Sequence, residues 1–497
     1  MQPFNLDIEN LSTGGFCKAY WKSDYITFGN KNNAQGMRNM DLRNPHRLTQ
    51  GPSLQRLTNG DESGVIGTLV LKIMPRAFAS NETFGVAGKN IIKITPTTVT
   101  VDHAIDQTEM GAGVQAKDVT EYGDLIYYVF DRTTANKATI GQRDAALAYD
   151  DNFMERSAGS TVGTFSLTFG VPHKLLVGGD DILYCTNGNE VSSYDRTNNV
   201  GVKTAIDLPY DAVVTDIEWN SKKLIITVDW PNLTGSNRTL QRIFVWNTVD
   251  SSWDDDVPQV RRSGALYTKE GITFVFYEDI TSDGGGRLGY FDGAVIKELF
   301  QFKGTLPKFY QVDEKDGFIT WISTVGSEDL VFCWGSGEPT LNARGFQLMK
   351  GKFNNAGAIG LPFGSVIIAT ENGLAGGDNI RCDLSKESGY THDAYLYGMT
   401  FPTSLEGKSS IIKKVMAEFD QLQLGAGTIL KLRNSAGTLL KTFEISYSAL
   451  GRKTKNIFYT TIRTEDIRPE IDPSSFVSTT TIVLLRRLKI NGFSINV

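Results

Sequence analysis

The chain has 497 residues, which is long enough for two or three domains and a sizeable core. Its 50 glycines and 10% aromatic residues, with Thr, Ser, Asn and Asp between short apolar runs, favour an all-β protein with many turns. The formal net charge of −6 argues against a general binder of phosphate backbones, which would need a basic face.

The start of the chain, residues 1–7, has neither the basic nor the apolar segment of a secretory signal. No apolar run is long enough to cross a membrane. We therefore expect synthesis in a cytoplasm. The four cysteines are far apart and lack any ligand spacing, so we expect buried free thiols rather than a metal site. They are Cys17, Cys185, Cys333 and Cys382.

Residues 1–64 are predicted to form an irregular N-terminal arm. Residues 15–21 and 24–28 have strand-like patterns, and residues 38–45 and 50–54 are rich in the Pro, Gly and Asn of turns. Such an arm must pack on something. It lies either on its own chain or on a neighbouring subunit, and both alternatives stay open.

A repeated pattern dominates the middle of the chain. Each unit has a polar turn, an apolar run, a second turn, and a second run that ends near an aromatic residue or an Asp. Five units follow one another at 178–195, 220–247, 269–292, 315–335 and 362–383. Their spacing of roughly 43 to 52 residues is the range in which four-stranded propeller blades recur.

Two weaker units precede these five, at 65–102 and 122–150. Sheets of this size cannot bury both faces alone, so they stack radially. The sequence therefore predicts an all-β fold with a seven-bladed β-propeller over residues 65–403.

After residue 403 the repeat stops. Residues 428–445 are predicted to form a hairpin, and 456–462, 480–485 and 487–491 three further strands. Residues 412–422 fit both helical spacing and alternation, and we interpret them as a strand. We predict a C-terminal β-sandwich over residues 404–497.

No catalytic constellation, cofactor motif or metal site is evident in the sequence. The histidines are scattered and are predicted to lie at surfaces or in turns. They are His46, His103, His173 and His392. The run Gly284, Gly285 and Gly286 precedes no helix, so we interpret it as a flexible hairpin tip rather than a phosphate loop. No GxSxG sequence places a nucleophilic serine.

Acidic residues near the predicted turns are the best candidates for catalytic residues if the chain is a glycosidase. A propeller can hold two carboxylates across its centre, as a glycosidase requires. The pool is Asp124, Asp180, Asp216, Asp316 and Asp378. Hairpin turns prefer Asp at such positions, however, and we favour that structural interpretation.

Aromatic and acidic residues elsewhere have a functional and a structural interpretation. Residues 253–256, a Trp followed by three Asp, would bind a cation or form a solvated loop, and they lack the flanking residues of a sialidase Asp-box. Tyr267, Tyr277 and Trp321 would stack on sugars or lie in the core between blades. We favour the loop and the core.

The order of parts resembles the β-propeller structural proteins of tailed-bacteriophage virions, such as tail hub, nozzle and tail-tip components. The Pro/Gly-rich arm at 43–60, the first strand at 64–69, and the C-terminal runs at 412–419 and 427–432 carry the resemblance. It covers most of the chain, but through pattern and order rather than invariant residues, and it assigns no site residue.

The resemblance implies a non-enzymatic structural protein of the virion tail, made in the host cytoplasm. It implies a homo-oligomeric ring, hub or tip subunit that contacts other tail proteins, without cofactor, membrane insertion or sequence-specific nucleic-acid binding. The alternative is a tail-tip propeller that binds or depolymerises a host surface glycan or receptor. That alternative would need a carboxylate pair facing the centre of the ring.

Overall fold

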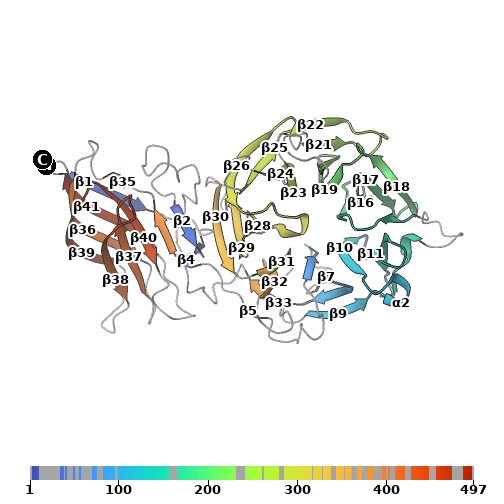
Figure 1. Cartoon of the computed structure of the whole chain (residues 1–497), viewed down its shortest axis with the longest axis horizontal. Helices are drawn as coiled ribbons and strands as arrows, with labels where there is room; N and C mark the ends of the chain where they lie inside the picture. Colours follow the sequence, from blue (N-terminus) through green and yellow to red (C-terminus); the bar gives the residue numbers. More distant parts are fainter. Residues whose placement is uncertain are drawn as a thin grey trace.

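A computed structural model describes the chain in part. Side chains are described for residues 71–74, 82–95, 100–155, 165–230, 242–257, 262–278, 285–314, 317–326, 329–336, 343, 345, 409–418, 428–445, 456–472 and 488–492. For the remaining strands the backbone alone is described. The fold is all-β, as predicted, and its antiparallel sheets lie around a ring with further sheets to one side (Figure 1).

The sheets of the ring are built from consecutive strands. The first is β6 (Val70–Ile73), β7 (Thr83–Ala87), β8 (Asn90–Ile94) and β9 (Val99–Ala104). The second is β10 (Gln115–Tyr122), β11 (Leu125–Arg132), β12 (Lys137–Arg143) and β13 (Tyr149–Asp150), with β14 (Leu167–Thr168) also on β12. The third is β15 (Leu175–Val177), β16 (Leu183–Asn187), β17 (Glu190–Asp195) and β18 (Val200–Asp207).

The next sheets repeat this order. They are β19 (Val213–Asn220), β20 (Lys223–Asp229), β21 (Gln241–Trp246) and β22 (Asp255–Gln259); then β23 (Ser263–Lys269), β24 (Ile272–Glu278), β25 (Gly285–Phe291) and β26 (Ile296–Lys303). They continue with β27 (Val312–Lys315), β28 (Phe318–Val325), β29 (Glu328–Gly335) and β30 (Arg344–Gly351). The last begins with β31 (Phe353–Gly360), β32 (Val366–Glu371) and β33 (Asn379–Asp383).

The first strand of each sheet contacts the first strand of the next. These contacts run in order through β6, β10, β15, β19, β23, β27 and β31, and β31 in turn contacts β6. The first strands therefore surround the centre of the ring, and later strands of each sheet lie further out (Figure 1).

Where their side chains are described, the second strands of the ring sheets are buried on both faces. In β20, for example, Leu224, Ile225, Ile226, Thr227 and Val228 are all buried. Double coverage explains why these strands are nearly continuous apolar runs rather than alternating ones. These are the runs from which the repeat was predicted.

Hydrophobic clusters join neighbouring sheets. Trp321 of β28 is fully buried against Phe276 and Phe302 of the preceding sheet, with ring centroids 5.2 Å apart in both cases. Tyr277 is 6% exposed. The core interpretation of Trp321 and Tyr277 is thereby confirmed, whereas Tyr267 is only half-buried.

The N-terminal arm contributes strands to distant sheets. Strand β5 (Gln55–Arg56) is the outermost strand of the last ring sheet, where Arg56 pairs with Ile380 of β33. Strands β3 (Met40–Asp41) and β4 (Thr49–Gln50) pair with each other. Because β5 comes from the arm, the last sheet joins strands some 320 residues apart in the sequence.

Two further sheets contain the C-terminal strands. One is β1 (Pro3–Glu9), β41 (Leu485–Ser494), β36 (Ser410–Phe419) and β39 (Lys455–Thr464). The other is β2 (Ala34–Arg38), β34 (Tyr395–Gly398), β40 (Asp466–Asp472), β37 (Gly427–Arg433) and β38 (Leu439–Ser446), with β35 (Phe401–Pro402) on β40. The strand interpretation of residues 412–422 is confirmed over 412–419 by β36.

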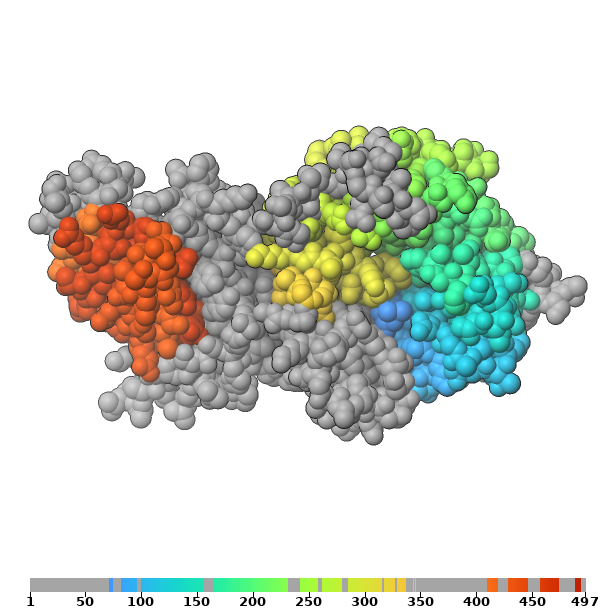
Figure 2. Space-filling model, in the orientation of Figure 1, coloured from blue at the N-terminus to red at the C-terminus, as the bar shows by residue number. Residues whose placement is uncertain are grey.

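Phe443 of β38 and Phe458 of β39 link these two sheets, with ring centroids 4.9 Å apart. The described residues of the C-terminal sheets lie at one end of the molecule, and those of the ring at the other (Figure 2). The predicted domain boundaries at 64/65 and 403/404 remain predictions.

Helical structure is sparse in the described residues. It consists of α2 (Gln107–Met110), η3 (Phe153–Glu155) and η5 (Phe309–Gln311). None of the helices described is long and apolar enough to span a membrane.

Candidate functional site

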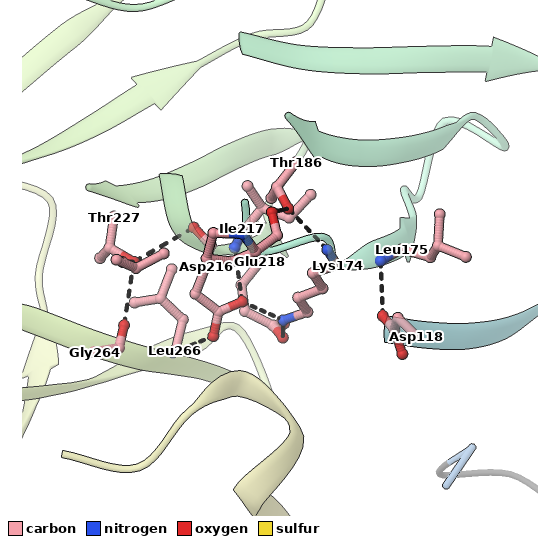
Figure 3. A network of polar contacts seen from close by, with 12 residues as sticks. Asp118, Lys174, Leu175, Thr186, Asp216, Ile217, Glu218, Thr227, Gly264 and Leu266 are labelled. Carbon is pink, nitrogen blue, oxygen red and sulfur yellow. Dashed lines mark hydrogen bonds and ion pairs between the residues drawn. The ribbon is translucent and has the colours of Figure 1, made fainter. Parts of the chain in front are cut away.

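A buried lysine joins two neighbouring sheets at the centre of the ring (Figure 3). Lys174 comes just before β15, and its Nζ lies 2.6 Å from Asp216 Oδ1 and 2.8 Å from Glu218 Oε1, both on β19. The three side chains are 9%, 0% and 17% exposed. This arrangement places three charges almost out of water, where they are tolerated because they pair.

The pKa values of this group follow from burial and pairing. Burial alone would lower the pKa of the Lys174 ammonium, but the charges of Asp216 and Glu218 outweigh it and raise that pKa. Burial raises the pKa of Asp216 to about 6 against the attraction of Lys174. The lysine therefore stays charged, and Asp216 takes up a proton only in mild acid.

Aspartates of the first strands also hold the next sheet through its backbone. Oδ2 of Asp118 accepts from the N–H of Leu175 at 2.7 Å, and Oδ2 of Asp216 accepts from the N–H of Leu266 at 2.6 Å. Each bond crosses from one first strand to the chain at the next (Figure 3). These two carboxylates thus fasten neighbouring sheets together, which is a structural role.

An aromatic side chain lies beside these charges. Phe309 of η5 is 9% exposed, and its ring centroid lies 5.8 Å from Lys72 Nζ and 6.0 Å from Lys174 Nζ. The two lysines come from the first strand of one sheet and the start of another, so Phe309 stands between sheets at the centre of the ring. Cation–π attraction adds to the burial of this side chain.

More accessible carboxylates lie on β19 and β27. The side chains of Glu218 and Glu314 are 17% and 23% exposed, and Glu314 Oε1 lies 3.0 Å from Lys269 Nζ. Tyr267 lies on β23, the first strand between β19 and β27, and burial and then the charges of Asp313, Glu314 and Glu218 raise its pKa. Neighbouring first strands therefore carry two partly exposed carboxylates and one half-buried tyrosine.

The five aspartates considered as candidate catalytic residues lie in different kinds of position. Asp124 lies in the β10–β11 turn with φ of 64°, and Asp180 lies in the β15–β16 turn, where its Oδ1 accepts from the N–H of Ile182. Their turn interpretation is confirmed. Asp216 is not a turn residue but lies in β19 at the ring centre. Asp316 and Asp378 lie outside the described residues.

Lys174, Glu218 and Glu314 were not among the site residues predicted from the sequence. The repeated pattern predicted the second and third strands of each sheet, whereas these residues lie on or beside first strands. A signal was nevertheless present, because Asp118 and Asp216 each stand one residue before a β-branched residue and seven or eight before the next apolar run. A search for aspartates at a fixed offset from the repeat would have found the first strands.

One histidine prediction was wrong. His173 is fully buried, not at a surface or in a turn exposed to water, and its ring nitrogens lie 2.7 Å from Thr186 O and 2.9 Å from Thr168 O. Burial lowers the pKa of His173. His103 lies in β9, where its Nε2 is 2.9 Å from Asp151 Oδ1. His46 and His392 lie outside the described residues.

The glycine run is not a hairpin tip over its last two residues. Gly285 and Gly286 belong to β25, and a Cβ at Gly286 would lie 2.2 Å from the ring of Phe302. Close packing, rather than flexibility, requires glycine there. Gly284 lies outside the described residues.

Residues 253–256 are only partly a loop. Trp253 packs on Phe244, with ring centroids 5.1 Å apart, and β22 begins at Asp255. Asp254 pairs with Lys223 at 3.0 Å, and Asp256 pairs with Arg242. Basic neighbours therefore already neutralise two of the three carboxylates.

The cysteine prediction is confirmed where it can be compared. Cys185 and Cys333 are free and buried, and burial raises the pKa of the Cys185 thiol. Cys17 lies outside the described residues, and Cys382 lies in β33, of which the backbone alone is described. Within the described part of the chain, no group of three His, Cys, Asp or Glu side chains is arranged to hold a metal ion.

No family model matches the chain, and no curated protein matches it. Among solved structures, it is similar to the β-propeller domain of the Trilobed protease from Pyrococcus furiosus, with 10% identity, a TM-score of 0.41, and coverage of 64% of this chain and 93% of that one. A chain of the mitotic checkpoint complex is also similar, with 8% identity, a TM-score of 0.41, and coverage of 68% of this chain and 95% of that one.

Two other similar structures are glycosidases. One is a glycoside hydrolase family 43 arabinoxylan arabinofuranohydrolase from Bacillus subtilis, with 10% identity, a TM-score of 0.28, and coverage of 89% and 99%. The other is an exo-β-1,3-galactanase from Phanerochaete chrysosporium, with 10% identity, a TM-score of 0.32, and coverage of 88% and 99%. The prediction that the chain is not an enzyme is corrected on this finding and is withdrawn.

Proposed function

We propose that the chain is a tail-tip protein of a bacteriophage virion that binds, and in one form of the proposal depolymerises, carbohydrate of the host surface. In this proposal residues 65–403 form seven blades and residues 404–497 a β-sandwich. The tail assignment is supported by the order of arm, propeller and C-terminal strands in the sequence. The carbohydrate assignment is supported by the ring centre.

One observation carries the carbohydrate proposal: Glu218 and Glu314, both partly exposed, lie on the first strands on either side of β23, which carries Tyr267. Carboxylates accept hydrogen bonds from sugar hydroxyls, and an aromatic ring packs on the apolar face of a sugar. Two carboxylates that flank a glycosidic bond are also the minimum that glycoside hydrolysis requires. The group is therefore suited to a saccharide.

The experiment measures binding and turnover separately. The purified chain is applied to an array of bacterial surface polysaccharides, and release of reducing ends is followed on those that bind. We expect Glu218→Gln and Glu314→Gln to weaken binding at least tenfold. Glu444→Gln, at an exposed position of β38 far from the ring, is the matched control and should change nothing.

Two results would contradict the proposal. One is a wild-type chain that retains no polysaccharide of any host at millimolar concentration. The other is that the Glu218→Gln and Glu314→Gln variants bind polysaccharide with the same affinity as the Glu444→Gln control. Binding without release of reducing ends would support recognition and reject depolymerisation.

A second candidate function is favoured by the arm. Strands β1, β2 and β5 each complete a sheet formed by distant residues, so the same arm can complete a sheet of another copy. The chain would then be a ring or hub subunit in contact with other tail proteins. Light scattering across a concentration range tests this, since a defined oligomer supports it and a monomer at every concentration makes assembly depend on a partner.

A further inference from the structure

Three aspartates hold corresponding positions in the first strands of alternate ring sheets: Asp118 in β10, Asp216 in β19 and Asp313 in β27. They are 1%, 0% and 4% exposed. In each, Oδ1 accepts from the N–H of the following residue, at 2.8, 2.7 and 2.7 Å. Because this local bond is the same, the second oxygen of each carboxyl can be compared directly.

The second oxygens differ. Those of Asp118 and Asp216 accept from a backbone N–H at the next first strand, at 2.7 and 2.6 Å. Oδ2 of Asp313 is buried and has no hydrogen-bond partner among the residues that the structure describes. The next first strand, β31, does contact β27. The first two aspartates therefore fasten their junctions, and the third does not.

The charged and titratable groups around Asp313 come from several described elements. They are Lys72 of β6, Glu314 of β27 itself and Tyr267 of β23. Burial raises the pKa of Asp313 to about 7, opposed by the N–H of Glu314 and the charge of Lys72, while the charge of Glu314 adds to the rise. A carboxylate oxygen without a donor is costly in the interior, so the neutral carboxyl is preferred.

We propose that the junction between β27 and β31 is a seam of the ring that is intact while Asp313 carries a proton and loosens when Asp313 ionises. The new charge must draw water or a backbone donor towards Oδ2, and either changes the contact of β27 with β31. The junctions at Asp118 and Asp216 stay closed, because their oxygens already have donors. This inference concerns the ring itself and does not depend on the proposed carbohydrate site.

The test compares Asp313→Asn with the wild type at pH 5 and pH 8.5. The folded-state pKa of Asp313 lies above the ordinary value of 3.8, so the folded chain loses stability as pH rises from about 4 through about 7. Asn has the same shape and cannot ionise. We expect equal thermal midpoints at pH 5, and a midpoint several degrees higher for the variant at pH 8.5.

Asp118→Asn and Asp216→Asn are the matched controls. Each loses a carboxylate oxygen that accepts a cross-strand bond, so we expect lower midpoints at both pH values. The proposal is overturned if Asp313→Asn behaves as these controls do.

Hydrogen exchange provides a second measurement that needs no variant. Between pH 6 and pH 8, exchange of the β27 and β31 amides, corrected for the intrinsic rate, should rise severalfold, while that of the β19 and β23 amides stays constant. The same change in exchange at the β27–β31 and β19–β23 junctions would contradict the proposal.

Discussion

Lys174 and Asp216 form a salt bridge of 2.6 Å at the centre of the ring, and neither side chain reaches water to any extent, with exposures of 9% and 0%. The lysine comes from the start of β15 and the aspartate from β19, so the pair ties two sheets together. Asp216 also bonds the backbone of a third sheet at Leu266. One carboxylate thus connects three successive sheets.

Replacement of this lysine should be severe. Lys174→Met leaves Asp216 buried without its cation, and we expect a loss of about 3–5 kcal/mol in the free energy of unfolding at pH 7. Denaturant titration measures it. Because the pKa of Asp216 is already about 6, the loss should shrink at pH 5, where the carboxyl is protonated.

The control for that variant is an exposed pair. Lys223 lies 3.0 Å from Asp254 but is 48% exposed, so Lys223→Met should cost no more than about 1 kcal/mol. Equal losses of unfolding free energy from Lys174→Met and Lys223→Met would show that the buried ion pair stabilises the fold no more than the exposed one.

Gly286→Ala tests close packing in β25. The new Cβ would meet the ring of Phe302 at 2.2 Å, so we expect a loss of about 1–3 kcal/mol. The double variant Gly286→Ala, Phe302→Leu makes room for the methyl group and should recover part of that loss relative to Phe302→Leu alone. Strictly additive losses would argue against the clash.

The contacts of Asp151 predict how the stability of the fold changes at low pH. Its carboxylate accepts from the N–H of Asp106 and from Tyr128 Oη and pairs with His103 Nε2. Burial raises its pKa, but the bonds from His103 and Tyr128 outweigh burial and hold that pKa below 3.8. The group therefore adds stability above pH 4, and this stability is lost as pH falls through the folded-state pKa.

Asp151→Asn should accordingly cost about 1–3 kcal/mol at pH 6 and less at pH 3. Urea titrations at the two pH values measure the difference. The same loss at both would mean that the carboxylate charge does not matter at this position.

Two deletions in the N-terminal arm distinguish its contribution to the ring from its contribution to the C-terminal sheets. Deletion of residues 1–60 removes β1, β2 and β5, so we expect faster proteolysis of both the C-terminal sheets and the last ring sheet. Deletion of residues 1–45 keeps β5 and should spare the ring. If both deletions leave proteolysis of the ring unchanged, β5 is not needed for closure.

The sequence predicted the strands that are covered on both faces. Leu224 and Val275 belong to runs whose apolar pattern is dense because neighbouring sheets bury both sides. First strands such as β19 place Asp216 and Glu218 among apolar residues, since these carboxylates bond to groups of the adjacent sheets. That pairing is a relation between distant residues, and no local pattern contains it.

Strand β40 was missed for a related reason. It contains Pro469 and four charged residues, a composition that argues against a central strand. It nevertheless pairs with both β34 and β37. Lys431 lies 2.7 Å from Asp472, and Arg433 2.6 Å from Glu470. Partners on β37 thus satisfy charges that would otherwise keep this segment out of a sheet.

The pairing of β1 with β41 sets the order in which the protein can be completed. Pro3 is opposite Phe493, so β1 leaves the ribosome some 490 residues before the strand with which it pairs, and it waits for that strand. At common rates of synthesis that wait is roughly 25 to 100 s. During that time β1 is a free strand edge, and nascent chains on the same messenger RNA are its nearest alternative partners.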